Sequence, residues 1–128
     1  MSYKNLEIWK LADELVVEIH QMTLNLPKFE MYEEGAQIRR SIKTTKATIV
    51  EGYGRRRYKA DYIKYLIYAL SSNDESIDHL ENLFKTNSLK DKNVFDSIHY
   101  KLNELGKKIN RFITGVEDTS WNYERPNT

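Results

Sequence analysis

The chain has 128 residues, of which 40% are hydrophobic and 30% are charged, and it contains no cysteine. This length suits one domain with a hydrophobic core, and the lack of cysteine excludes disulfides, thiolate zinc sites and a cysteine nucleophile. No apolar run approaches the roughly 20 residues that a membrane-spanning helix needs, so we expect a cytoplasmic protein with no membrane partner.

Apolar residues recur at spacings of three and four along most of the chain, which is typical of amphipathic helices. Asn5 can cap the first helix, and Pro27 ends it because proline disfavours helix in the preceding residue. Ser88 and Asp91 form the pattern of a capping box before the last helix, whose hydrophobic seam is the most regular. The predicted helices cover about residues 5–26, 30–53, 58–86 and 89–114.

Four long helices joined by short links predict an all-α fold, an up-down-up-down antiparallel four-helix bundle formed by residues 1–116. No alternating strand pattern competes with this interpretation, and the small number of glycines and prolines also disfavours a turn-rich β fold. Residues 117–128 show no periodicity, so we expect a flexible C-terminal tail, from which Trp121 can dock on the bundle.

Three glycines indicate places where two helices come close together. Gly52 and Gly54 end the second predicted helix, and such a pair is expected where a corner needs positive φ or close backbone approach. Gly106 lies inside the last helix, where it costs about 1 kcal/mol relative to alanine. We therefore expect a neighbouring backbone to pack closely against Gly106.

Charge is distributed unevenly, although the formal net charge is only +1. Between residues 39 and 64, nine basic residues are opposed by only two acids, Glu51 and Asp61. The basic residues are Arg39, Arg40, Lys43, Lys46, Arg55, Arg56, Arg57, Lys59 and Lys64. Acids gather further along the chain, from Asp74 to Glu81, so the molecule is electrically lopsided.

The basic segment is a candidate nucleic-acid surface. Arg39, Lys43 and Lys46 are spaced to share one helix face, and the three arginines of the corner follow at its far end. Basic and aromatic side chains together suit contact with the phosphates and exposed bases of RNA or DNA. The interleaved tyrosines are Tyr53, Tyr58, Tyr62, Tyr65 and Tyr68. The alternatives are salt bridges between subunits or simple solvation, with Arg55 paired to a carboxylate of the bundle.

No catalytic pattern is recognisable in the sequence. A di-iron site in a bundle needs two Glu-x-x-His pairs, and His20, His79 and His99 do not provide them. No serine lies in a nucleophile elbow, and the stretch EGYGRRR is not a Walker loop because no Gly-Lys-Ser follows it. We therefore predict no enzyme activity, no metal, no cofactor and no small-molecule substrate. A hydrolase would need a deep pocket containing Glu51, Glu75 or a histidine.

Two stretches are familiar, QIRRSIKTTKATIVEGYGR at residues 37–55 and DYIKYLIYALSSNDES at residues 61–76. They resemble the four-helix-bundle proteins encoded in intervening sequences of bacterial 23S rRNA genes, often labelled the S23 ribosomal protein family. The strongest motif is the Glu-Gly-x-Gly-Arg corner, and the first helix also resembles the family's, with its Phe-Pro-x-x-Glu-x-Tyr link. The matching positions are Gln37, Arg39, Arg40, Glu51, Gly52, Gly54, Arg55, Ala69, Ser72 and Glu75. Lys46, Thr48 and Ser71 depart from the family pattern.

The resemblance implies antiparallel bundles that assemble as ring-shaped homopentamers and whose biochemical role is unsettled. A related bundle, the accessory protein of diversity-generating retroelements, is a basic pentamer that works with a reverse transcriptase and nucleic acid. We therefore expect a non-catalytic, homo-oligomeric binding or scaffold protein that contacts RNA or DNA through its basic surface. The alternative is a protein–protein assembly module, in which the basic stripe of one subunit meets the acidic stretch of the next.

Overall fold

The computed structural model describes residues 2–118 and 120–123, and these residues form four long helices and no strand. The helices are α1 (Glu7–Leu24), α2 (Glu34–Gly54), α3 (Lys59–Lys85) and α4 (Lys92–Glu117). Two short 3-10 helices accompany them, η1 (Tyr3–Asn5) before α1 and η2 (Lys28–Met31) between α1 and α2. The predicted all-α class with four helices is confirmed.

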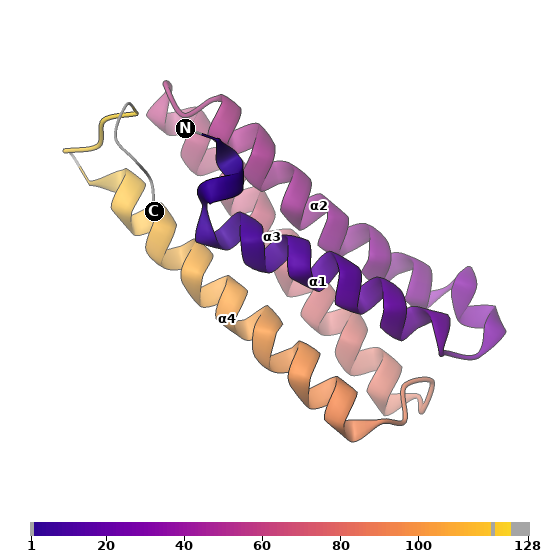
Figure 1. Cartoon of the computed structure of the whole chain (residues 1–128). Coiled ribbons are helices and arrows are strands. Elements are labelled where there is room, and N and C mark those ends of the chain that lie inside the picture. The colour runs from indigo at the N-terminus through magenta and orange to yellow at the C-terminus, as the bar shows by residue number, and fades with distance from the viewer. Residues whose placement is uncertain (1, 119, 124–128) are drawn as a thin grey trace.

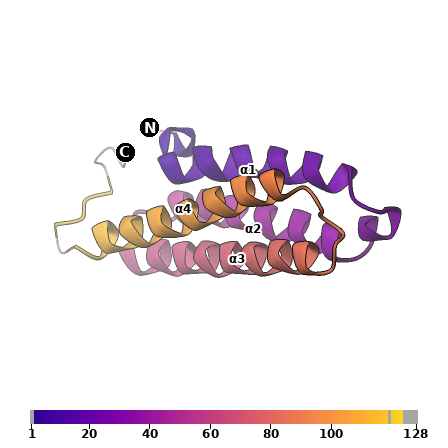
Figure 2. The same ribbon diagram turned by 90° about the horizontal axis from the view of Figure 1, so that it is seen from below.

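Each helix runs in the opposite direction to the one before it, as Figures 1 and 2 show. The N-terminus, the corner between α2 and α3 and the end of α4 lie at one end of the bundle (Figure 1), which we call the corner end. The α1–α2 and α3–α4 connections lie at the other end, which we call the link end. No helix in the described part of the chain is both long and apolar enough to span a bilayer.

All four helices contribute one buried side to a shared core. On α4 the buried positions follow the predicted seam, with Ile98, Leu102, Leu105 and Ile109 each at most 3% exposed. Full burial of such a side chain contributes roughly 1.5–3 kcal/mol relative to leaving it exposed. The periodic apolar residues therefore account for the bundle, and their regular spacing keeps the opposite face of each helix free for polar groups.

The helix starts differ from the prediction because tertiary contacts decide them. Leu6 rather than Asn5 is the N-cap residue of α1, since Asn5 belongs to η1 and Leu6 is buried. The second helix begins at residue 34 rather than 30, because the link first forms η2. Asp91 alone caps α4, where its Oδ1 accepts hydrogen bonds from the N–H groups of Asn93 and Val94. Ser88 takes no part in a capping box.

The two glycines at the end of α2 have different surroundings. The helix continues through both of them, and no glycine of the described chain has positive φ, so that part of the corner prediction is wrong. A Cβ on Gly52 would lie 3.1 Å from Cβ of Tyr65 and 3.3 Å from Cδ1 of Tyr62, whereas one on Gly54 would meet nothing within 4 Å. Close approach of α3 therefore explains Gly52 alone.

Gly106 faces a side chain rather than the neighbouring backbone that we expected. A Cβ at this position would lie 3.2 Å from Nδ2 of Asn73, which is fully buried on α3. That Nδ2 donates a hydrogen bond to the backbone oxygen of Leu102 on α4 at 2.9 Å. Because Gly106 has no side chain, the buried amide of Asn73 on α3 can reach the backbone of α4.

Candidate functional site

Seven of the nine basic residues from 39 to 64 fall into two groups on the folded chain. The α2 cluster lies on the first half of α2, and the corner cluster lies where α2 passes into α3. Fifteen residues separate Arg40 from Arg55, which is roughly 22 Å along a helix. Lys64 is exposed on α3, and Glu51 is exposed on α2 between the two clusters. The α2 cluster comprises Arg39, Arg40 and Lys43, and the corner cluster comprises Arg55, Arg56, Arg57 and Lys59.

The α2 cluster borders a shallow groove of about 490 Å³ on the surface of α2. The groove forms where the small side chains of Ala36 and Ala47 lie beside the long basic ones. The Arg39 side chain is held in place by a hydrogen bond from its Nη2 to the backbone oxygen of Met31 at 2.9 Å. Arg40 and Lys43 are exposed, and neither forms an ion pair with a carboxylate in the described residues. This cluster therefore presents positive charge to solvent.

Lys46 does not join that cluster, although its spacing predicts a shared face. Its Nζ lies 2.8 Å from Oδ1 of Asp13 on α1, and it also lies 5.3 Å from the centre of the Trp9 ring. Both partners lie on α1, so the lysine fastens α1 to α2. Because its charge is balanced inside the chain, Lys46 contributes less to a surface for anions than Arg40 or Lys43.

Each arginine of the corner lies over an aromatic ring. The guanidinium carbon is 4.8 Å from the centre of Tyr65 for Arg55, 4.0 Å from that of Tyr53 for Arg56 and 5.3 Å from that of Tyr123 for Arg57. Such contacts contribute about 0.5–1 kcal/mol at exposed sites and hold the planar group in one orientation. Arg55 also pairs with Asp61 at 3.7 Å, which confirms the expected carboxylate partner.

The tyrosines near these arginines are poorly placed to stack on bases. Tyr53 and Tyr62 are buried, and Tyr65 packs edge-on against Tyr68 while Arg55 lies over its ring. Burial raises the pKa of the Tyr62 hydroxyl. Tyr58, at 64% exposure, is the most open of the interleaved rings. The corner therefore favours contact with phosphates over contact with bases.

The start of the predicted tail is docked on this corner. The Trp121 ring lies 5.6 Å from the Tyr62 ring, and its Nε1 donates to the backbone oxygen of Arg56 at 3.4 Å. Lys59 donates through Nζ to the backbone oxygens of Glu117 and Asp118, at 2.9 and 3.0 Å, and so satisfies carbonyls at the end of α4. We call residues 117–123, apart from residue 119, the C-terminal strap. The tail prediction for 119 and 124–128 lies outside the described residues.

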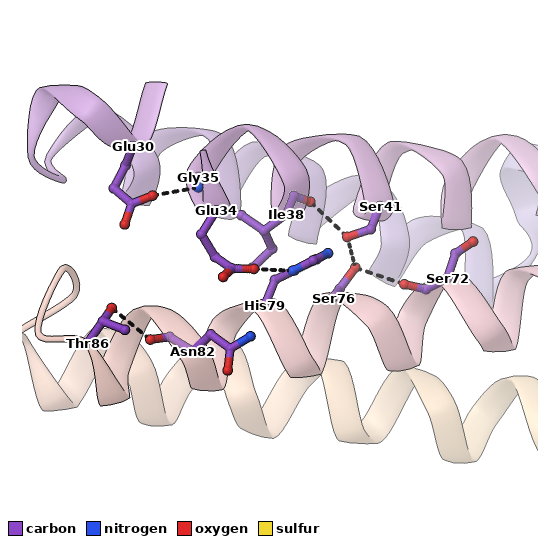
Figure 3. A network of polar contacts seen from close by, with 10 residues as sticks. All are labelled: Glu30, Glu34, Gly35, Ile38, Ser41, Ser72, Ser76, His79, Asn82 and Thr86. Carbon is purple, nitrogen blue, oxygen red and sulfur yellow. Dashed lines mark hydrogen bonds and ion pairs between the residues drawn. The ribbon is translucent and has the colours of Figure 1, made fainter. Parts of the chain in front are cut away.

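A second polar region lies between α2 and α3, toward the link end (Figure 3). The hydroxyls of Ser41 and Ser76 are buried and 2.7 Å apart, so one donates to the other, and each also lies within hydrogen-bond distance of a helix carbonyl, that of Ile38 at 3.2 Å and that of Ser72 at 3.0 Å respectively. Beside them, Nδ1 of His79 forms a short contact with the carboxylate of Glu34. These contacts join α2 to α3 along a groove of about 500 Å³. The groove is lined by Gln37, Arg40, Ser41, Thr44, Ser72, Glu75 and His79.

This α2–α3 groove contains two of the groups that a hydrolase would need, Glu75 and His79. Within the described residues, however, no serine hydroxyl bonds to a histidine, because Ser41 and Ser76 bond to each other and to helix carbonyls. A serine needs an adjacent base to act as a nucleophile. The described chain also contains no group of three or more side chains arranged to hold a metal ion. The described residues therefore show neither a serine–histidine pair nor a metal-binding cluster in this groove.

Comparison with known families gives a clear result. A model described as 23S rRNA-intervening sequence protein matches residues 4–111. The chain belongs to this family. A crystal structure of a protein of unknown function from the S23 ribosomal protein family of Bacteroides thetaiotaomicron VPI-5482 superposes with a TM-score of 0.73 at 23% identity, covering 84% of this chain and 95% of that chain. No curated protein matches. The likeness in structure confirms the fold, and neither description states an activity.

The residues that carry the family resemblance occupy three places in the fold. Glu51, Gly52, Gly54 and Arg55 form the end of α2 and the start of the corner. Ala69 is buried in the core. The remaining positions, which come from both α2 and α3, line the two neighbouring surface grooves that share Arg40. They are Gln37, Arg39, Arg40, Ser72 and Glu75.

Glu30 is an important residue that the charge pattern did not reveal. Only 4% of it is exposed, and its two carboxylate oxygens accept hydrogen bonds from the N–H of Gly35 at 3.2 Å and the hydroxyl of Ser88 at 2.6 Å. It therefore joins η2, the first turn of α2 and the α3–α4 connection (Figure 3 shows the bond to Gly35). The available signal was the family's link pattern, in which Glu30 follows Pro27 by three residues.

Proposed function

We propose that the protein is a non-catalytic, homo-oligomeric binding protein that contacts the phosphate backbone of RNA or DNA through the α2 cluster and the corner cluster. One observation carries the proposal. Of the nine basic residues, only Lys46 and Arg55 form an ion pair with a carboxylate in the described part of the chain. The others keep positive charge near the surface without a balancing acid, which is the electrostatic property that a polyanion requires.

The surroundings of the arginines favour phosphates as the point of contact. Because Tyr53, Tyr65 and Tyr123 each carry a guanidinium on one face, that face is closed to a base. The guanidinium edges remain suited to bidentate contact with phosphate oxygens. Phosphate contacts position a protein on nucleic acid without reading its sequence. The proposed binding therefore has little sequence preference.

Anisotropy measurements with labelled single-stranded RNA and duplex DNA over a series of salt concentrations test this function. The affinity is expected to fall steeply with salt. Arg40→Ala combined with Lys43→Ala is expected to weaken binding to all sequences and to lower the salt slope by about two. A matched control removes the same charge from α4, where Lys107 and Arg111 are exposed. Equal losses in both double variants, or binding that ignores salt, would overturn the proposal.

A second candidate function is supported by the acidic face of α3. Asp74, Glu75 and Asp78 are exposed, and none of them forms an ion pair within the described residues. This face complements the α2 cluster, so the two faces of successive subunits can meet in a head-to-tail contact of the kind that closes rings. The homopentamer that the family resemblance implies would be built by such a contact.

Light scattering coupled to size exclusion tests the assembly function. Asp74→Lys combined with Asp78→Lys is expected to convert the oligomer to monomer, because like charges then face each other. Adding Arg40→Glu and Lys43→Glu restores opposite signs and is expected to restore the oligomer. An oligomer whose mass is unchanged by the first pair of substitutions rules out this contact.

A further inference from the structure

The C-terminal strap engages the side chains of two of the four corner cations, Lys59 and Arg57, and the backbone of a third, Arg56. Lys59 uses two of its three N–H donors on the carbonyls of Glu117 and Asp118, and Arg57 contacts the hydroxyl of Tyr123 at 3.4 Å through Nη2. The carbonyl of Arg56 accepts the indole N–H of Trp121. The strap thus reaches the corner over a sequence separation of about 60 residues, and Trp121 packs against the edge of the core there.

We propose that the strap competes with nucleic acid for the corner cluster, so that binding of a polyanion releases the strap. This inference rests on the proposed function and adds a regulatory element to it. The same donors serve both ligands, because an ammonium whose N–H groups point at the end of α4 cannot direct them at a phosphate. Glu117 and Asp118 also bring exposed carboxylates to the corner, where they repel phosphate.

Two of the strap's hydrogen bonds are long. The hydrogen bonds of Trp121 and Tyr123 are both 3.4 Å long, beyond the usual range for N–H···O bonds. Arg57, which donates to the Tyr123 hydroxyl, is exposed. Segments with few buried contacts and exposed hydrogen bonds open at low free-energy cost. By linkage, the docked strap weakens polyanion binding by the same free energy by which the bound polyanion weakens docking of the strap.

The affinity test uses the full-length chain with Trp121→Ala and Tyr123→Ala, and a labelled single-stranded oligouridine as probe. Loss of the strap is expected to raise affinity roughly fivefold and to steepen the salt slope by about one. Phe112→Leu is the matched control, because Phe112 also packs against the Tyr62 ring, at 5.7 Å, but is not part of the strap. An equal gain in the control, no gain in the double variant, or a loss of affinity would each overturn the inference.

A spectroscopic test follows the strap itself. The chain has two tryptophans, so Trp9→Phe leaves Trp121 as the single reporter. Oligouridine is expected to shift its emission to the red as the indole leaves Tyr62 for water. Binding without a change in emission would contradict the competition.

The two proposals fail in distinguishable ways. If Arg56→Ala with Arg57→Ala weakens binding while the strap variant binds with unchanged affinity, the strap inference fails and the proposed function stands. If the oligouridine does not bind, or binds equally well to every cation variant, both fail.

Discussion

Charged side chains have opposite surroundings at the two ends of the bundle. At the link end, the Glu30 carboxylate is buried and both of its oxygens accept hydrogen bonds. At the corner end, Arg55 and Arg57 are exposed and lie over tyrosine rings. A buried charge is costly unless it is hydrogen-bonded, whereas an exposed charge contributes little to stability. Charge at the link end is therefore part of what holds the fold together, whereas the exposed charge at the corner end adds little to stability.

The largest effect should come from breaking the link end. Glu30→Ala is expected to lower the free energy of unfolding by about 3 kcal/mol, because the N–H of Gly35 and the hydroxyl of Ser88 lose their acceptor. Glu30→Gln keeps the shape and one oxygen, so its cost is expected to be about 1 kcal/mol. Urea denaturation of both variants measures the difference. If alanine is tolerated as well as glutamine, the buried carboxylate does not organise this end.

The corner end can be disturbed through its backbone while its charge is kept. Gly52→Ala is expected to lower the free energy of unfolding by about 1–2 kcal/mol, since its Cβ would press on Tyr62 and Tyr65. Gly54→Ala is the control, and its helical position with open space predicts a gain of up to about 1 kcal/mol. Thermal melting of the two variants should therefore give shifts of opposite sign. Shifts of the same sign contradict the close approach.

The corner end also contains a buried polar group, the hydroxyl of Tyr62, whose effect on stability can be measured. This hydroxyl has no hydrogen-bond partner in the described residues. Tyr62→Phe is therefore expected to raise the free energy of unfolding by about 1 kcal/mol at neutral pH. Because burial raises the pKa of Tyr62 above its ordinary 10.0, the unfolded chain loses the proton first, and stability falls above pH 10. Denaturation from pH 7 to 11 should show a smaller alkaline loss in the variant.

The smallest effect separates a paired cation from an unpaired one on the same helix. Lys46→Met is expected to lower the free energy of unfolding by about 0.5 kcal/mol, because it removes a partly exposed ion pair with Asp13. Lys43→Met should leave stability unchanged and weaken RNA binding instead. Chemical denaturation measures the free energy of unfolding of both variants, and anisotropy measures their affinity for RNA. If the two lysines behave alike in both assays, pairing within the chain does not decide which cations are available.

Periodicity was sufficient for the helices because core burial repeats along each one. It placed Leu102 and Leu105 correctly, since the seam of α4 needs no knowledge of the other helices. It failed for Lys46, whose direction depends on Asp13, a residue 33 positions away on another helix. The start of α2 was misplaced because η2 precedes it and Glu30, a residue of η2, satisfies its first turn. Trp121 lies in a segment without apolar periodicity. The sequence therefore indicated that it can dock but did not predict where.

The buried amide of Asn73 fixes the position of α3 along the axis of α4. Sliding one helix past the other by a single turn, about 5.4 Å, would take the amide away from the Leu102 carbonyl and from the gap beside Gly106. An amide N–H group buried without that acceptor costs about 1–3 kcal/mol. The Asn73 side chain therefore sets the register between these two helices and opposes sliding of one along the other.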